Sequence, residues 1–171
     1  DAKNYGIGLI PEDRKNLGVV LNKAIDWNIT LTILQRISQW GILNKKKENR
    51  IAKNYSENLK VKTPSLKQKV KLLSGGNQQK IVLAKWMATD LKVIIFDEPT
   101  RGIDVNAKHE IYKLINGQVK KGMAVIMISS DMEELLGMSD RLIVFSEGGL
   151  SGELKKEEFS QAKVLEYASG K

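Results

Sequence analysis

Two stretches of the chain decide its fold, LLSGGNQQK at residues 72–80 and KVIIFDEPTRGID at residues 92–104. In the first, two glycines precede a segment with helical character, so backbone N–H groups at a helix start can approach an anion closely. In the second, four apolar residues lead directly into an acid pair, which is typical of a buried strand that delivers carboxylates to the carboxyl end of a sheet. Each pattern alone is equally compatible with an ordinary helix cap or turn.

The surrounding sequence predicts an α/β protein. We expect strands at residues 5–10, 93–96, 124–128 and 142–145, and helices at 77–88, 105–119 and 132–138. Strands that alternate with helices favour one parallel sheet covered by helices. Gly148-Gly149 predicts a hairpin turn, with an antiparallel edge strand over 150–154.

A helical insertion interrupts this predicted core. Residues 28–40 and a second stretch with Ile51, Tyr55 and Leu59 have apolar residues at helical spacing, with a polar lysine loop between the two stretches. We therefore divide the chain into an α/β core at 1–20 and 74–154, a helical subdomain at 21–73, and a helical tail at 155–171.

Composition excludes several classes of protein. The 171 residues include no Cys, so there is no disulfide, and a reducing compartment is permitted. No apolar run approaches the roughly 20 residues of a membrane-spanning helix, and no secretory signal is visible, which favours the cytosol. The formal net charge is +8 from scattered cations, which is weak evidence for nucleic-acid binding. We assign no role to the lone His109 and expect Trp27, Trp40 and Trp86 to be packing residues.

Taken together, LSGGNQQ followed by VIIFDEPTRGIDV resembles the ATP-binding cassette (ABC) ATPases, a P-loop NTPase-like family. IPEDRKNLG resembles the Q-loop region of these ATPases, and MISSDMEELLGMSDR at 127–141 resembles their switch region. The combination is most similar to the second cassette of the tandem ATPases that power ribose- and galactose-type sugar importers. Among the three tryptophans, Trp40 is of most interest, because the helical subdomain of this family lies near the membrane partner.

The resemblance implies ATP and Mg²⁺ as cofactors and a role for each matching position. Asp97 would hold Mg²⁺ through water, and Glu98 would orient or deprotonate the attacking water. The other implied positions are the signature residues Ser74, Gly75, Gly76, Asn77 and Gln78, the Q-loop position Glu12, the D-loop residue Asp104 and the switch position Ser130.

Three positions depart from the family pattern. Glu12 stands where glutamine is usual, Ser130 stands where histidine is usual, and Asn77 replaces a glutamine. Residues 1–171 also contain no G-x-x-x-x-G-K-[ST] phosphate loop. We therefore expect the chain to be part of a longer polypeptide, incomplete at its N-terminus, and inactive and prone to self-association when isolated.

The resemblance also implies partners. We expect a first cassette or a second copy to complete the site, a membrane permease to contact the helical subdomain and the Q-loop region, and a sugar-binding protein to act indirectly. The protein would lie at the cytoplasmic face of the membrane. The alternative is a soluble ABC-type ATPase that acts on the ribosome or on nucleic acid. A DNA-repair type is disfavoured, because only residues 13–73 separate the Q-loop and signature regions and they carry no sustained heptads.

Overall fold

The computed structural model describes residues 1–170. The chain divides into two compact units, Asp1–Ile126 and Met127–Lys171.

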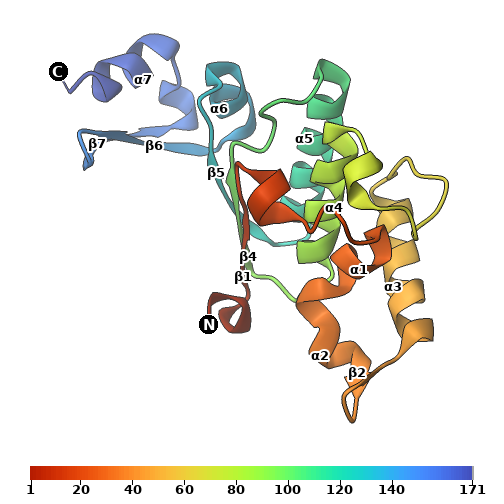
Figure 1. Cartoon of the computed structure of the whole chain (residues 1–171). Helices are drawn as coiled ribbons and strands as arrows, with labels where there is room; N and C mark the ends of the chain where they lie inside the picture. The colour runs from red at the N-terminus through yellow and green to blue at the C-terminus, as the bar shows by residue number, and fades with distance from the viewer. Residues whose placement is uncertain (171) are drawn as a thin grey trace. The chain divides into compact units, whose positions relative to one another are not determined.

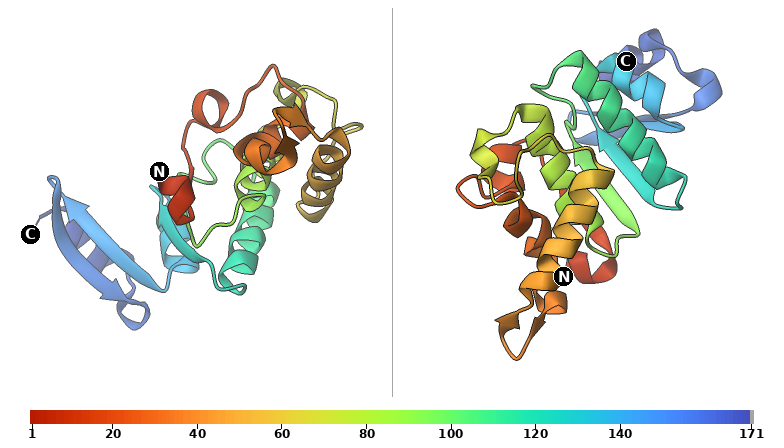
Figure 2. Two further views of the ribbon diagram at one scale, coloured as in Figure 1. Left: turned by 90° about the horizontal axis from the view of Figure 1, so that it is seen from below. Right: turned by 90° about the vertical axis from the view of Figure 1, so that its right-hand side faces the viewer.

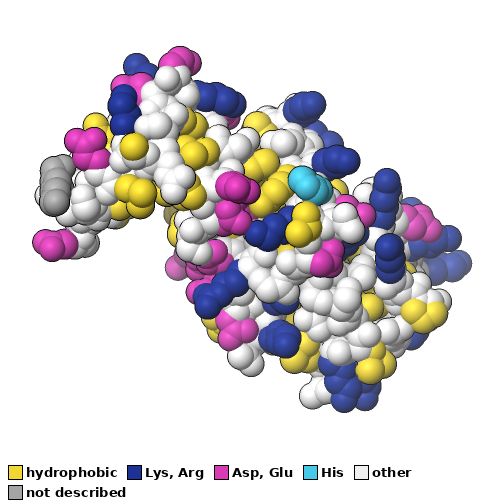
Figure 3. Space-filling model, turned by 90° about the horizontal axis from the view of Figure 1, so that it is seen from above, with side chains coloured by type: hydrophobic (Ala, Val, Ile, Leu, Met, Phe, Trp, Pro, Cys, Tyr) yellow, Lys and Arg dark blue, Asp and Glu magenta, His cyan; other side chains and the backbone are white. Residues whose placement is uncertain are grey.

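No helix within residues 1–170 is long and apolar enough to cross a membrane. Lys and Arg side chains occur over all of the face shown in Figure 3, with Asp and Glu among them, which agrees with the scattered charge of the sequence.

A three-stranded sheet forms the centre of the fold, with the strand order β1-β4-β5 (Figure 1). Its strands are β1 (Ile7–Ile10), β4 (Val93–Asp97) and β5 (Ala124–Ile128). β1 and β4 are parallel, with Ile7 opposite Val93 and Ile10 opposite Phe96. The parallel α/β architecture that the sequence predicts is therefore confirmed.

Two strand predictions need correction. The first strand begins at Ile7 rather than at residue 5, because Ala2–Tyr5 forms a 3-10 helix that ends at the left-handed Gly6. The strand at residues 124–128 has the predicted bounds but is not buried, since Ile126 and Ile128 are 51% and 52% exposed.

The segment between β1 and β4 is mostly helical, but the predicted helix over 28–40 is wrong. It breaks into short pieces that end in a hairpin: α1 (Ile25–Thr30), a 3-10 turn (Leu31–Ile33), α2 (Leu34–Ile37), β2 (Ser38–Gln39) and β3 (Ile42–Leu43). The hairpin turns at Trp40 and Gly41, both of which have positive φ (54° and 76°).

The predicted polar loop of lysines is also wrong. Lys45–Lys47 form the first turn of α3 (Lys45–Asn58), because the Asn44 side chain caps this helix by accepting the Lys47 N–H at 2.9 Å. After α3, a loop leads to a 3-10 turn (Val70–Leu72) and then to α4 (Gly75–Met87). α5 (Val105–Val119) follows β4 with the predicted bounds.

The core of the first unit forms where α4 packs against β1 and α1 packs against α4 (Figures 1 and 2). Ile25 and Ile29 from α1, Ile81 from α4, and Ile94 and Phe96 from β4 are all fully buried. Since β4 alternates between buried and half-buried residues, only one of its faces is fully covered.

The second unit is built on a β-hairpin. β6 (Arg141–Ser146) pairs antiparallel with β7 (Gly149–Lys155), as predicted for residues 150–154. The expectation that residues 142–145 extend the parallel sheet is wrong, because the sheet that holds β6 contains β7 alone among the described strands. Leu142, Val144, Leu154 and Val164 form the buried cluster of this unit.

Two helices accompany this hairpin. They are α6 (Met132–Met138), with the predicted bounds, and α7 (Gln161–Ala168), which follows a 3-10 turn at Lys156–Glu158. Val164 of α7 contributes to the buried cluster, and Met132, Leu135 and Leu136 of α6 pack against it. α7 ends at Ala168, within the stretch 155–171 that we expect to be a helical tail, and residue 171 lies outside the described part of the chain.

Candidate nucleotide site

The signature loop opens α4. Ser74 is the N-cap in extended conformation, and Gly75 and Gly76 are the first two residues of the helix, so α4 begins two residues earlier than predicted. The Ser74 hydroxyl accepts from the Asn77 amide at 2.9 Å and is solvent-exposed. N–H groups in the first turn of a helix have no partner within the helix, and the dipole there is positive, so this end suits an anion.

The two glycines are required by packing within the chain. A Cβ at Gly75 would lie 2.7 Å from Arg14 Nη2 and 3.3 Å from the Gly102 carbonyl oxygen. A Cβ at Gly76 would lie 2.9 Å from Ala107 Cβ. The close contacts show that the signature loop packs directly against the segment that follows β4.

Asn77 and Gln78 fix the loop from the side of the helical segment. Asn77 Oδ1 accepts from the Lys62 N–H at 2.8 Å. Gln78 is 5% exposed, and its amide donates to the carbonyls of Leu73 and Val70 at 3.2 and 3.4 Å. The Gln78 side chain therefore points into the protein and supports the loop.

The acid pair lies at the end of β4. Asp97 is the last residue of the strand and is half-buried. Glu98 has a φ of 48°, a left-handed conformation that is uncommon for residues other than glycine and is concentrated at functional sites. The turn then continues through Thr100, which is 3% exposed. Both acids of the pair are thus half-buried residues at the start of this turn.

The Q-loop and D-loop regions are joined by two arginines. Arg14 Nη1 donates to the Arg101 carbonyl at 2.8 Å, and Nη2 donates to the Gly102 carbonyl at 3.3 Å. The Arg101 guanidinium forms an ion pair with the Glu12 carboxylate. The negative charge of Glu12 is therefore balanced by a cation of this same chain.

Asp104 caps α5. Its carboxylate accepts the Ala107 N–H at 3.0 Å, so Asp104 has a structural role that the sequence did not predict. Together these contacts bring the predicted Q-loop, signature and D-loop positions close to Arg14.

Arg14 and Arg101 were not predicted as functional residues. Their only signal in the sequence is their position, since each follows a strand-end acid by two or three residues.

Ser130 belongs to the second unit. It is exposed and lies in the loop between β5 and α6. The neighbouring Asp131 caps α6 by accepting the N–H groups of Glu133 and Glu134, which fixes the local backbone.

Two lysines of α4, Lys80 and Lys85, follow the signature loop and make contacts with neighbouring segments. Lys80 is 4% exposed and pairs with Glu110 of α5 at 2.7 Å, and this hydrogen bond lowers the pKa of Glu110. Burial lowers the pKa of Lys85, whose ammonium donates to the Gly18 carbonyl at 2.5 Å. Both lysines connect α4 to neighbouring segments.

Mg²⁺ in phosphate sites commonly binds through one or two carboxylates, waters and phosphate oxygens. Within residues 1–170 no group of three or more His, Cys, Asp or Glu residues could hold a metal. Asp97, at the carboxyl end of the central strand β4, fits the type of Mg²⁺ site in which phosphate oxygens and waters supply the other ligands.

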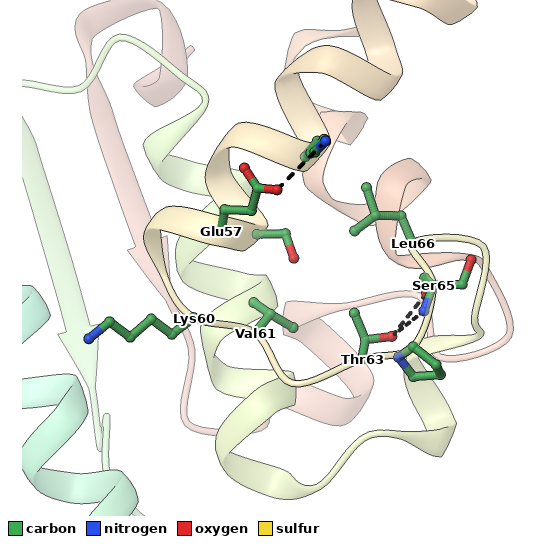
Figure 4. Close-up of a pocket in the computed structure, with 9 residues that line it drawn as sticks. Glu57, Lys60, Val61, Thr63, Ser65 and Leu66 are labelled. Atoms are coloured by element: carbon green, nitrogen blue, oxygen red, sulfur yellow. Dashed lines mark hydrogen bonds and ion pairs between the residues drawn. The ribbon is translucent and has the colours of Figure 1, made fainter.

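Two hollows in the surface lie away from these residues. One of about 300 Å³ lies between α3 and the loop that follows it, lined by residues such as Glu57, Lys60, Val61 and Leu66 (Figure 4). Another, of about 320 Å³, lies at the β2–β3 hairpin. Neither hollow is lined by a predicted site residue.

Solved structures with the same fold define the class of protein. The ATP-binding cassette MJ1267, in its ADP conformation, has a TM-score of 0.74 and 22% identity over 99% of this chain and 70% of its own. A nucleotide-free ABC cassette has a TM-score of 0.77 and 20% identity over 97% of this chain and 69% of its own. The fold is that of an ABC ATPase.

The family is established by sequence. Residues 5–101 match the model of the ABC transporter family, and the chain belongs to this family. It is 49% identical over 170 residues to the xylose import ATP-binding protein XylG of Thermoanaerobacter pseudethanolicus, and 50% identical over 169 residues to the ribose import ATP-binding protein RbsA of Clostridium tetani. These alignments cover 99% and 98% of this chain, but the chain spans only 34% of the length of either relative.

Proposed function

We propose that the chain is the C-terminal part of a nucleotide-binding domain in an importer of monosaccharides, where it couples ATP hydrolysis to uptake. Relatives at about this level of identity are ATP-binding proteins for xylose, ribose and arabinose import. The observation that carries the proposal is the packing of the signature loop against the D-loop segment, with Arg14 joining both to the Q-loop region.

The proposed division has a core at 1–20 and 74–154, a helical subdomain at 21–73 and a tail at 155–171, and it gives the first two parts a task. The core supplies the site, and the helical subdomain and Q-loop region contact a membrane permease. A binding protein outside the membrane would select the sugar. The protein would then act at the cytoplasmic face of the membrane.

The signature loop would serve a nucleotide that another lobe holds. The exposed Ser74 hydroxyl and the N–H groups of Gly75 and Gly76 would donate to its phosphate oxygens. Asn77 and Gln78 would keep the loop in this geometry through their contacts with Lys62 and Leu73. A first cassette or a second copy of this chain is the proposed source of the other lobe.

The strand-end acids would serve this domain's own site. Asp97 would hold Mg²⁺ through water, and the ion would neutralise charge on the phosphates. Glu98, fixed by its left-handed backbone, would orient the attacking water and accept its proton. Glu12, Asp104 and Ser130 would stand at the Q-loop, D-loop and switch positions, and the Arg101 ion pair would reduce the repulsion between Glu12 and phosphate.

Steady-state ATPase measurements test this assignment in a polypeptide that joins the chain to a lobe with a phosphate loop. We expect Ser74→Arg to reduce turnover by roughly 100-fold or more, because it removes a donor and fills the phosphate position. Glu98→Gln is expected to have a smaller effect, because it alters only this domain's own site. If Glu98→Gln abolishes turnover while Ser74→Arg leaves it near normal, the assignment is wrong.

A soluble ATPase that acts on RNA is the competing function. Binding of RNA that weakens steeply with salt would favour it, whereas capture by a permease would favour transport. The clustering of the matched motifs does not separate these two outcomes, but the names of the relatives favour transport.

A further inference from the structure

The β2–β3 hairpin projects beyond the ends of α2 and α3 (Figure 1 and the right-hand view of Figure 2). Two large apolar side chains of this hairpin are exposed. Trp40 is 93% exposed and Ile42 is 74% exposed. With Gln39 and Asn44, they line an open hollow of about 320 Å³. Most of the apolar surface at this tip is therefore in contact with solvent.

The identity of Trp40 is not explained by the turn. Gln39 pairs with Ile42, so Trp40 and Gly41 form a two-residue loop, and both have positive φ. Loops of this kind favour Asn-Gly, because asparagine tolerates the left-handed region. A tryptophan there has an unfavourable backbone and little packing, and a residue that breaks local preferences without a structural gain marks a functional position.

The charges around the tip are of one sign. Residues 34–50 carry five cations and one acid. The cations are Arg36, Lys45, Lys46, Lys47 and Arg50. The acid, Glu48, is 1% exposed and accepts a hydrogen bond from Lys45 at 2.9 Å. The exposed ionisable groups of this segment are therefore all cationic.

We propose that this tip inserts into the headgroup region of a bilayer that contains anionic phospholipid. Tryptophan is enriched at membrane–water interfaces, where its ring is amphipathic, and an adjacent apolar residue adds buried area. Cations near an anionic surface are attracted to it. The segment offers both features on a narrow projection, and the cations complement the lipid charge. The proposal requires neither nucleotide nor permease and is therefore independent of the proposed function.

Flotation with vesicles of phosphatidylcholine, with and without phosphatidylglycerol, tests the proposal on the whole chain. We expect binding that depends on phosphatidylglycerol and weakens with salt. Trp40→Asn should reduce the partition coefficient by roughly ten-fold, because it removes the buried ring. It should leave the thermal unfolding midpoint unchanged or raise it, since asparagine suits the turn.

A charge variant tests the electrostatic part. Lys46→Gln with Arg50→Gln avoids the Lys45–Glu48 pair and should reduce binding by roughly 25-fold, at about five-fold per cation. Matched controls are Lys120→Gln with Lys121→Gln at the end of α5, and Tyr5→Asn, which removes an aromatic side chain that is 76% exposed. Both controls should change binding by less than about two-fold.

Three results would overturn the proposal. The first is no binding to anionic vesicles by a folded chain. The second is binding that Trp40→Asn leaves unchanged. The third is a loss of permease capture by Trp40→Asn with vesicle binding unaffected, which would make the tip a protein-docking surface instead.

Discussion

The Arg14 guanidinium donates to the Arg101 carbonyl over 2.8 Å, which joins the segment after β1 to the turn after β4. A second bond, to Gly102 at 3.3 Å, makes the contact bidentate. Since Gly75 leaves room for the same guanidinium, the position of the signature loop depends on it as well.

Replacement of Arg14 should therefore loosen three segments at once. We expect Arg14→Ala to lower the free energy of unfolding by about 2 kcal/mol, because two hydrogen bonds of roughly 1 kcal/mol each are lost. Arg14→Lys should recover only part of this, since an ammonium lacks the planar fork. Denaturant titration measures the effect, and Arg50→Ala, at an exposed position of α3, is the control. Equal effects of Arg14→Ala and Arg50→Ala would contradict this role.

Alanine substitutions distinguish two effects on stability at the glycines of α4. One is the space that packing requires, and the other is helix propensity. Propensity alone predicts that Gly76→Ala stabilises α4 by about 1 kcal/mol. We expect destabilisation instead, because the new Cβ would lie 2.9 Å from Ala107 Cβ. Adding Ala107→Gly should restore part of the loss.

Gly117 of α5 is the matched control for this experiment. A Cβ there meets nothing within 4 Å, so Gly117→Ala should stabilise the protein by roughly 0.5–1 kcal/mol. If thermal or denaturant unfolding shows that both alanine variants are stabilised alike, the signature loop does not pack as described.

The Lys80–Glu110 pair should make stability depend on acid pH. The pKa of Glu110 lies below its ordinary 4.5 in the folded protein. The ion pair therefore makes its full contribution to the free energy of unfolding at pH values above 4.5. This contribution is lost as the pH falls through the lowered pKa of the folded protein. Glu110→Gln should cost below about 1 kcal/mol at neutral pH, because the carboxylate is half exposed. Unfolding curves across this range should show the wild type and the variant converging in acid. Glu57→Gln, which weakens an exposed pair with Lys53, should show little of this dependence.

Burial of Lys85 should make the stability of the protein depend on pH in the alkaline range. Because burial lowers its pKa below the ordinary 10.5, the unfolded chain binds more protons in the window between the two values, and stability rises with pH there. The free energy of unfolding of the wild type should therefore increase relative to that of Lys85→Met as pH approaches 10.5. A constant difference would show that the burial of this ammonium has no effect on its titration.

The bounds of three elements were predicted correctly from the sequence. The helices at 105–119 and 132–138 have the predicted bounds. The strand at 124–128 also has the predicted bounds, but its predicted burial was wrong, because Ile126 and Ile128 are half exposed. The Trp40-Gly41 hairpin was missed, because its turn uses a tryptophan where the known turn signals are asparagine or aspartate. The apolar spacing of residues 28–40 resembled one helix although α2 ends at Ile37.

The candidate site was predicted in its motifs but not in its connections. Ser74, Asp97 and Glu98 were identified because glycines before a helix and acids after a strand have a direct physical meaning. The contacts of Arg14 and the interior position of Gln78 depend on segments far apart in the sequence. No local pattern encodes such contacts, so these roles required the structure.

The most direct test of the central claim is a structure of a polypeptide that joins this chain to a phosphate-binding lobe, trapped with nucleotide. The account predicts that Ser74 Oγ and the Gly76 N–H lie about 3 Å from oxygens of a γ-phosphate held by the other lobe. A signature turn far from any γ-phosphate in that trapped state would contradict it.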